Sequence, residues 1–100
     1  MSLADRVLHP ALLERVMSAD AAAALIPAGA NVGMSGFTGA GYPKAVPLAL
    51  AERAKRDPLK ITLMTGASLG HDLDKILAEA KVTARRMPFQ SDPGLRRAIN

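Results

Sequence analysis

The chain has 100 residues and a mass of 10.5 kDa, the size of one domain. Hydrophobic residues make up 49% of it, but nineteen of them are alanine and only three are aromatic, so aliphatic side chains must build the core. The absence of cysteine excludes disulfides and thiolate metal sites, and two distant histidines, His9 and His71, argue against zinc. No apolar run approaches the ~18 residues of a membrane-spanning helix, and residues 1–10 lack a signal-peptide core. We therefore expect a soluble, cytoplasmic protein without a membrane partner.

The formal net charge of +4 arises entirely in the second half of the chain. Three basic and three acidic residues cancel in residues 1–50, whereas residues 51–100 contain ten basic and six acidic residues. A basic balance favours anionic ligands. However, the aromatic residues that would stack on bases are not interleaved with lysine and arginine. We therefore expect a solvated basic surface and no nucleic-acid partner.

The predicted elements begin with two short helices. The first covers residues 10–16, with proline in its first turn, where a missing N–H costs little. Ser18 is a suitable N-cap for the second helix, over residues 19–26, which the Pro-Ala-Gly sequence at 27–29 ends. Residues 30–35 have no helical period and predict the first strand.

Helices and strands alternate in the rest of the chain. A helix is predicted to start between Pro43 and Pro47, because a helix interior does not tolerate proline, and to end near Arg56. Residues 60–65 are apolar enough on both faces to form a strand buried within a parallel sheet. The next helix, over residues 71–80, has apolar residues at helical spacing. A weaker strand over residues 81–87 and a helical turn over residues 94–100 follow.

Two short helices followed by β-α-β-α-β predict an α/β fold with a parallel sheet and right-handed crossovers. Three segments, residues 35–44, 66–70 and 88–92, follow strands and emerge at the carboxyl edge, where open α/β sheets bind ligands. These segments, with Thr65 directly before the second, contain all the aromatic residues and a cluster of hydroxyls: Phe37, Tyr42, Phe89, Ser35, Thr38, Thr65, Ser68 and Ser91. The hydroxyls suit a carboxylate or carbonyl oxygen, although serine and glycine are also ordinary turn residues.

The glycines between Gly33 and Gly41 do not form a known phosphate motif. The dinucleotide fingerprint requires glycine at the sixth position counted from Gly39, where this chain has Lys44, and the Walker A motif fails because Tyr42 follows Gly41. What remains is general: glycine lets backbone N–H groups approach a ligand, and a helix N-terminus attracts anions. A free-standing anion- or nucleotide-binding α/β module without catalysis is therefore the alternative function, and a purely structural fragment is a third possibility.

The string Ser-Gly-Phe-Thr-Gly-Ala-Gly-Tyr-Pro-Lys at residues 35–44, followed by Val46-Pro47, closely resembles the N-terminal signature of the acetyl-CoA hydrolase/transferase family. The resemblance continues through residues 63–68, 86–92 and 95–100 in the family's order. It implies a protein with two α/β domains of the class I CoA-transferase type, in which residues 1–100 are the truncated N-terminal portion of the first domain. A homodimer is expected for the full-length enzyme, and a marginally stable or self-associating protein for the isolated chain.

The resemblance also implies a reaction, in which a glutamate of the second domain attacks an acyl-CoA thioester and forms a glutamyl-CoA thioester. A small carboxylate, or water, then completes the turnover. Coenzyme A is thus a substrate, and neither a cofactor nor a metal is expected. Glu14, Glu52 and Glu79 lie on predicted solvated helix faces, so we expect no catalytic residue here and no activity from the isolated chain. Hydrolase or transferase, and acetyl- or succinyl-CoA, stay open.

Substrate-binding residues carry over from the family position by position. The loops matching residues 66–68 and 88–92 line the pocket for the small carboxylate, with the hydroxyls of Ser68 and Ser91 as its ligands. The loop over residues 36–41 walls this pocket, and Phe37 or Tyr42 excludes water. The predicted substrate-binding residues are Gly36, Phe37, Thr38, Gly39, Gly41, Tyr42, Ser68 and Ser91. Two questions stay open: whether Lys44 attracts an anion or is inert, and whether Arg85, Arg86, Arg96 and Arg97 contact the rest of the protein or water.

Overall fold

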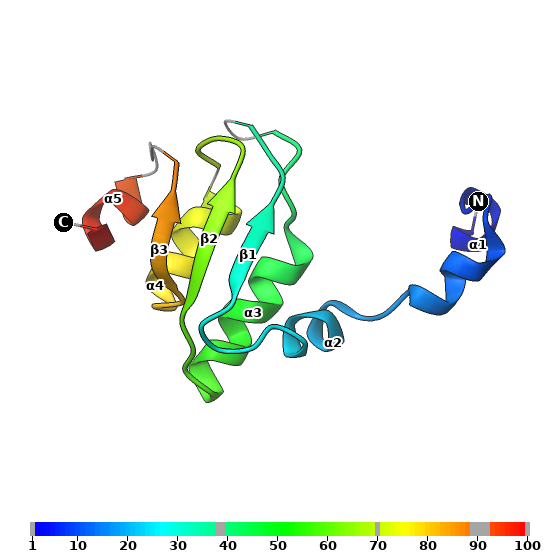
Figure 1. Ribbon diagram of the computed structural model, residues 1–100, viewed down its shortest axis with the longest axis horizontal. Helices are drawn as coiled ribbons and strands as arrows, with labels where there is room; N and C mark the ends of the chain where they lie inside the picture. The colour runs from blue at the N-terminus through cyan, green and yellow to red at the C-terminus, as the bar shows by residue number, and fades with distance from the viewer. Residues whose placement is uncertain (1, 38–39, 70, 89–92, 100) are drawn as a thin grey trace.

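The computed structural model describes residues 2–37, 40–69, 71–88 and 93–99, and its centre is a three-stranded parallel sheet (Figure 1). The strands are β1 (Asn31–Met34), β2 (Ile61–Thr65) and β3 (Thr83–Met87), in the order β1-β2-β3. Both pairings are parallel, as the alternation of helices and strands predicts. The α/β fold class and the three predicted strands are therefore confirmed, each boundary within two residues of its prediction.

The two crossover helices cover the same face of the sheet (Figure 1). The first is α3 (Ala45–Arg56), and the second is a π-helix, η2 (His71–Lys75), that runs into α4 (Ile76–Glu79). Both crossover connections lead to the next strand in the same direction across the sheet. Because such connections are right-handed, their helices lie on the same face of the sheet. The prediction that β2 is buried on both faces is therefore wrong: Met64 is 39% exposed on the open face.

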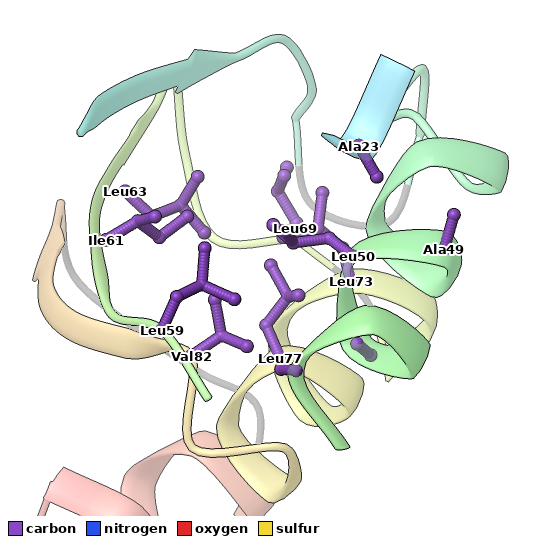
Figure 2. Packing of buried hydrophobic residues seen from close by; sticks show 12 residues of the cluster. Ala23, Ala49, Leu50, Leu59, Ile61, Leu63, Leu69, Leu73, Leu77 and Val82 are labelled. Carbon is purple, nitrogen blue, oxygen red and sulfur yellow. The ribbon is translucent and has the colours of Figure 1, made fainter. Parts of the chain in front are cut away.

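The core lies between this helix-covered face and the helices (Figure 2). Ile61 and Leu63 of β2 have no exposed surface, and Leu50 of α3 is fully buried opposite them. The apolar stripe predicted over residues 71–80 is confirmed, because Leu73 and Leu77 are fully buried. Aliphatic residues fill the layer, as the composition requires, and the buried cluster also includes Ala23, Ala49, Ala51, Ala54, Leu59, Leu69 and Val82.

Helix α3 starts at Ala45, between the two prolines, as predicted. Pro47 lies in its first turn and is buried, so the ring fills core space where its missing N–H costs no helical hydrogen bond. Arg53, near the other end of α3, reaches back to α2 (Ala19–Ala24). Its Nη1 donates to the carbonyl oxygens of Ala23 at 2.9 Å and Ile26 at 2.6 Å. This guanidinium therefore holds the end of α2 against α3.

The segment before the sheet layer contains three short helices. Ser18 caps α2 as predicted, since its Oγ accepts a hydrogen bond from the Ala21 N–H at 3.1 Å, although α2 ends two residues earlier than expected. The helix predicted over residues 10–16 is a 3₁₀ helix, η1 (Pro10–Arg15). The short helix α1 (Leu3–Arg6) was not predicted. A capping box between Ser2 and Asp5 stabilises its N-terminus. The hydrogen bonds from Ser2 hold the pKa of the Asp5 carboxyl below its usual value.

Residues 2–17 extend away from the sheet layer (Figure 1). Neither α1 nor η1 contains a buried residue. Leu8 is 96% exposed, and Leu3, Leu12, Val16 and Met17 are each at least half exposed. This arm therefore contributes nothing to the core of the described structure.

The last elements are β3 and α5 (Pro93–Ile99), which starts one residue before the predicted turn and buries Leu95. The peptide bond between Met87 and Pro88 is cis. The pairing of β2 with β3 contains a bulge: Ile61 lies opposite Thr83, but Thr62 lies opposite Arg85. Among the described residues, no helix is long and apolar enough to cross a membrane.

Candidate functional site

The loops that follow β1 and β2 lie at the carboxyl edge of the sheet and touch each other (Figure 1). Their contact point is Gly36, whose φ of 143° is rare for any residue with a side chain. A Cβ on Gly36 would lie 2.5 Å from Leu69 Cδ2 and 2.8 Å from Tyr42 Cβ. Only glycine allows this approach, so the sequence brings Gly36, Tyr42 and Leu69 into one cluster.

Ser68 lies directly before Leu69 in this cluster and is 7% exposed. The β2 loop packs against the β1 loop at a second point, since a Cβ on Gly66 would lie 3.2 Å from the carbonyl oxygen of Gly36. Leu69 points into the core beside Leu50 and Leu73 (Figure 2). The Ser68 backbone is therefore held between a core anchor on one side and the β1 loop on the other.

Two other hydroxyls of the predicted cluster serve their own loops. The Ser35 hydroxyl donates to the carbonyl oxygen of Gly41 at 3.4 Å, and the Thr65 hydroxyl donates to that of Ala67 at 2.5 Å. Both protons are thus committed to backbone acceptors. Three predicted site residues, Thr38, Gly39 and Ser91, lie outside the residues that the structure describes.

The aromatic residues of the β1 loop differ in their surroundings. Phe37 exchanges two backbone hydrogen bonds of 2.9 Å with Ala40, and it is 71% exposed. Tyr42 is half-buried and packs against the core cluster. Of these two aromatic residues, Tyr42 is the one placed to shield the carboxyl edge of the sheet from water. Gly41, next to it, has a φ of 69°, which favours glycine.

Lys44 lies over Tyr42, with its Nζ 4.1 Å from the ring centroid. This separation is well within the range of a cation–π interaction. Lys44 is also the N-cap residue of α3 and makes no side-chain capping hydrogen bond. Its ammonium group is thus held near the cluster around Gly36, on the side where α3 begins.

Sequence reasoning missed a buried ion pair behind the β2 loop. Arg86 Nε donates to Asp74 Oδ1 at 3.0 Å, and the two side chains are 2% and 0% exposed. Arg86 was expected to contact either water or a further part of the protein, and this expectation is wrong for Arg86. The residue register explains why: Arg86 lies opposite Leu63, so it shares the helix-covered face of the sheet. The available signal was Asp74 itself, an acidic residue at the margin of the apolar stripe of residues 71–80.

Residues 1–100 match the family described as acetyl-CoA hydrolase/transferase N-terminal domain. The chain belongs to this family. Among individual relatives, it is 43% identical over 97 residues to the succinyl-CoA:acetate CoA-transferase of Clostridium kluyveri, an alignment that covers 95% of this chain and 18% of the relative.

Two further relatives bear different activity names. The propanoyl-CoA:succinate CoA transferase of Escherichia coli is 43% identical over 89 residues, covering 84% of this chain and 18% of the relative. The acetyl-CoA hydrolase of Neurospora crassa is 36% identical over 103 aligned positions, covering 99% of this chain and 20% of the relative. The chain thus spans about a fifth of the length of the curated relatives that it matches.

The glutamates of this family segment are placed as surface groups. Glu52 forms an ion pair with Lys55 at 2.9 Å, and the hydrogen bond from Lys55 holds the pKa of the Glu52 carboxyl below its usual value. Glu79 lies 3.9 Å from Lys75, and Glu14 is exposed on η1. Within the described residues, no group of three histidine, cysteine, aspartate or glutamate side chains could hold a metal ion.

Three cavities among the described residues lie away from the carboxyl edge. One of about 340 Å³ lies between α4, β3 and α5, and two of about 330 and 350 Å³ border α3 and the end of α4. None of these three is lined by Gly36, Tyr42 or Ser68. The candidate site within the described residues is formed by the two touching loops around Gly36.

Proposed function

We propose that this chain forms the N-terminal share of the active site of an enzyme that moves coenzyme A between a short acyl-CoA, acetyl- or succinyl-CoA, and a small carboxylate. Hydrolysis, with water as the acceptor, is the second form of the same chemistry. The observation that supports this function is the contact of the two strand-end loops around Ser68, in a chain that belongs to the acetyl-CoA hydrolase/transferase family. The relatives carry both transferase and hydrolase names.

The proposed role of the loops is to bind the carboxylate end of the substrate. A carboxylate accepts hydrogen bonds from donors such as a serine hydroxyl, and a cation close to the donor strengthens the binding of the carboxylate further. Ser68 would supply the hydroxyl, and the Lys44 ammonium held over Tyr42 would add positive charge. Tyr42 would exclude water on that side. Gly36, Phe37, Thr38, Gly39, Gly41 and Ser91 complete the proposed substrate-binding set.

The covalent steps would take place on a glutamate outside residues 1–100. Its carboxylate oxygen attacks the thioester carbonyl, the C–S bond breaks, and coenzyme A leaves as a thiolate. The thiolate then attacks the glutamyl carbonyl of the resulting anhydride, which releases the acyl group as a carboxylate and leaves a glutamyl-CoA thioester. An acceptor carboxylate reverses these steps, or water hydrolyses the thioester. No metal or cofactor is needed, and we place the enzyme in the cytoplasm as a homodimer.

A chimera tests this proposal. Residues 1–100 replace the aligned segment of the Clostridium kluyveri relative, and transfer of coenzyme A from succinyl-CoA to acetate is measured. We expect a folded chimera that is active, whereas the same enzyme without any segment in this place is inactive. A folded chimera without activity would contradict the proposal. In parallel, calorimetric titration of the 100-residue chain with coenzyme A, acetate and succinate tests the binding-module alternative, which requires binding at micromolar strength.

A further inference from the structure

Asp74 is a buried carboxylate whose two oxygens serve two different elements. It lies in η2, and its side chain has no exposed surface. Oδ2 accepts a hydrogen bond from the backbone N–H of Leu69 at 2.9 Å, and Oδ1 accepts one from Arg86 Nε at 3.0 Å. Leu69, the partner of Oδ2, directly follows Ser68 in the β2 loop. Arg86, the partner of Oδ1, is the last but one residue of β3.

Arg86 completes the connection on the other side. Its Nη1 donates to the carbonyl oxygen of Met87, while Nη2 is buried and has no hydrogen-bond partner among the residues that the structure describes. A single guanidinium thus connects the end of β3 to Asp74, and Asp74 connects it to the β2 loop. Leu69 in turn touches Gly36 of the β1 loop. A continuous set of contacts therefore joins the carboxyl ends of all three strands.

Stability alone does not explain this pair. Burying two charges costs solvation free energy, and apolar residues of similar volume commonly hold elements together at least as well. What an ion pair with defined hydrogen bonds adds is geometry, because each bond fixes a direction as well as a distance. The atom that Asp74 fixes is the amide nitrogen adjoining Ser68, in a loop where the core already anchors the Leu69 side chain.

We infer that the Asp74–Arg86 pair is a brace for the carboxyl edge and that Asp74 is a positioning residue, which sets the place of the Ser68 hydroxyl. The inference deepens the proposed function and rests on it. Asp74 does not touch the substrate. It holds the backbone from which Ser68 donates, so its effect on carboxylate use must pass through Ser68.

A double-mutant cycle in the chimera tests this dependence. Asp74→Asn keeps the shape of the side chain but replaces one acceptor oxygen by a donor, so one of its two bonds is lost. We expect kcat/KM for acetate to fall about tenfold in the Ser68 background. In the Ser68→Ala background the same change should cost less than about twofold, because the hydroxyl that Asp74 positions is gone. Asp57→Asn, an exposed aspartate at the end of α3, is the matched control and should change nothing.

Amide hydrogen exchange of the 100-residue chain gives a readout that does not need activity. In Asp74→Asn the Leu69 amide should exchange about tenfold faster or more, while the Leu63 amide in β2 stays within about twofold of the parent. Arg86→Lys serves as the second variant if Asp74→Asn does not fold. It keeps the buried charge but loses the two-directional hydrogen bonding of the guanidinium, and it should show the same coupling to Ser68 with a smaller loss.

The possible results separate the two proposals. Equal losses in both Ser68 backgrounds, or a faster Leu69 amide with unchanged acetate use, would overturn the positioning role. A folded but inactive parent chimera, or Ser68→Ala with full activity, would overturn the proposed function. The exchange of Leu69 then still decides whether the brace exists, and an unchanged rate in both Asp74→Asn and Arg86→Lys would overturn it as well.

Discussion

Ser68 is the residue for which the proposed function makes its most direct prediction. A hydrogen bond to a charged group contributes about 1.5–3 kcal/mol, so Ser68→Ala should lower kcat/KM for the acceptor carboxylate by roughly tenfold to a hundredfold. The fold should persist, because removing one hydroxyl leaves no large cavity. Steady-state kinetics of the chimera with varied acetate measures the effect.

The matched comparison is Glu79→Ala, on the exposed side of α4. This variant should behave like the parent, since the Glu79 carboxylate lies 3.9 Å from Lys75 Nζ and the two side chains are 64% and 43% exposed, so this ion pair contributes little. Loss of activity in a folded Glu79→Ala enzyme, together with full activity in Ser68→Ala, would mean that the active edge is misplaced.

Gly36 tests the contact between the two loops. Gly36→Ala should destabilise the chain by about 1–3 kcal/mol, because alanine is strained at a φ of 143° and its methyl group would collide with Leu69 and Tyr42. Gly33→Ala is the control, since a Cβ there meets nothing within 4 Å. Urea unfolding of both variants provides the comparison. Equal stabilities would show that the close approach at Gly36 is not a constraint.

Residue-level prediction from sequence succeeded where a residue type has a narrow range of uses. Ser18 as a helix cap and the start of α3 between Pro43 and Pro47 are confirmed because capping and proline geometry are local properties. The Asp74–Arg86 pair was not predicted, because it joins residues twelve positions apart through the register of a strand. The substrate-binding set remains a prediction, and Thr38, Gly39 and Ser91 lie outside the described residues.

At the scale of elements, α2 depends on a side chain of α3. Arg53 satisfies two carbonyl groups at the end of α2, and Arg53→Met should therefore cost about 1.5–3 kcal/mol in unfolding free energy. Arg56→Met, three residues later and exposed, is the control and should cost little. Chemical denaturation measures both. If the two variants are equally stable, the Arg53 contacts do not hold α2 in place.

The order and type of the main elements could be predicted because their signals are periodic. The stripe of Leu73, Ile76, Leu77 and Ala80 identified a helix, but not that its first part is a π-helix, since that choice depends on how η2 packs. The exposure of Met64 could not be predicted either. A methionine in a strand has the same hydropathy whether or not a helix covers it, and coverage depends on the direction of the crossovers.

For the whole molecule, the open face of the sheet has a consequence in solution. Met64 and Met87 lie opposite each other on β2 and β3 and are 39% and 50% exposed. Parallel sheets are normally covered on both faces, so we expect the isolated chain to self-associate through this face. Sedimentation velocity over a wide range of concentration should show species larger than the monomer.

A pair of substitutions locates this association. Replacing both Met64 and Met87 by glutamine should shift the chain towards the monomer, while Leu48→Gln, at a residue that is 50% exposed on α3, should leave the association unchanged. A parent chain that stays monomeric at every concentration would contradict the expectation. An effect of Leu48→Gln equal to that of the methionine pair would place the contact elsewhere.

The bulge in β3 determines which of two neighbouring arginines lies on the helix-covered face of the sheet. Between two successive pairings, β2 advances by one residue and β3 by two, which leaves Ala84 as the extra residue. Since side chains alternate between faces, this extra residue decides that Arg86, and not Arg85, lies on the side of Asp74. If Ala84 paired with Thr62 in a regular register instead of forming the bulge, Arg85 would lie opposite Leu63 in the buried position and Arg86 would lie on the open face. A guanidinium would then still lie beside Asp74, but one residue further from Pro88. The segment after β3 would therefore leave the carboxyl edge of the sheet from a different position relative to the ion pair.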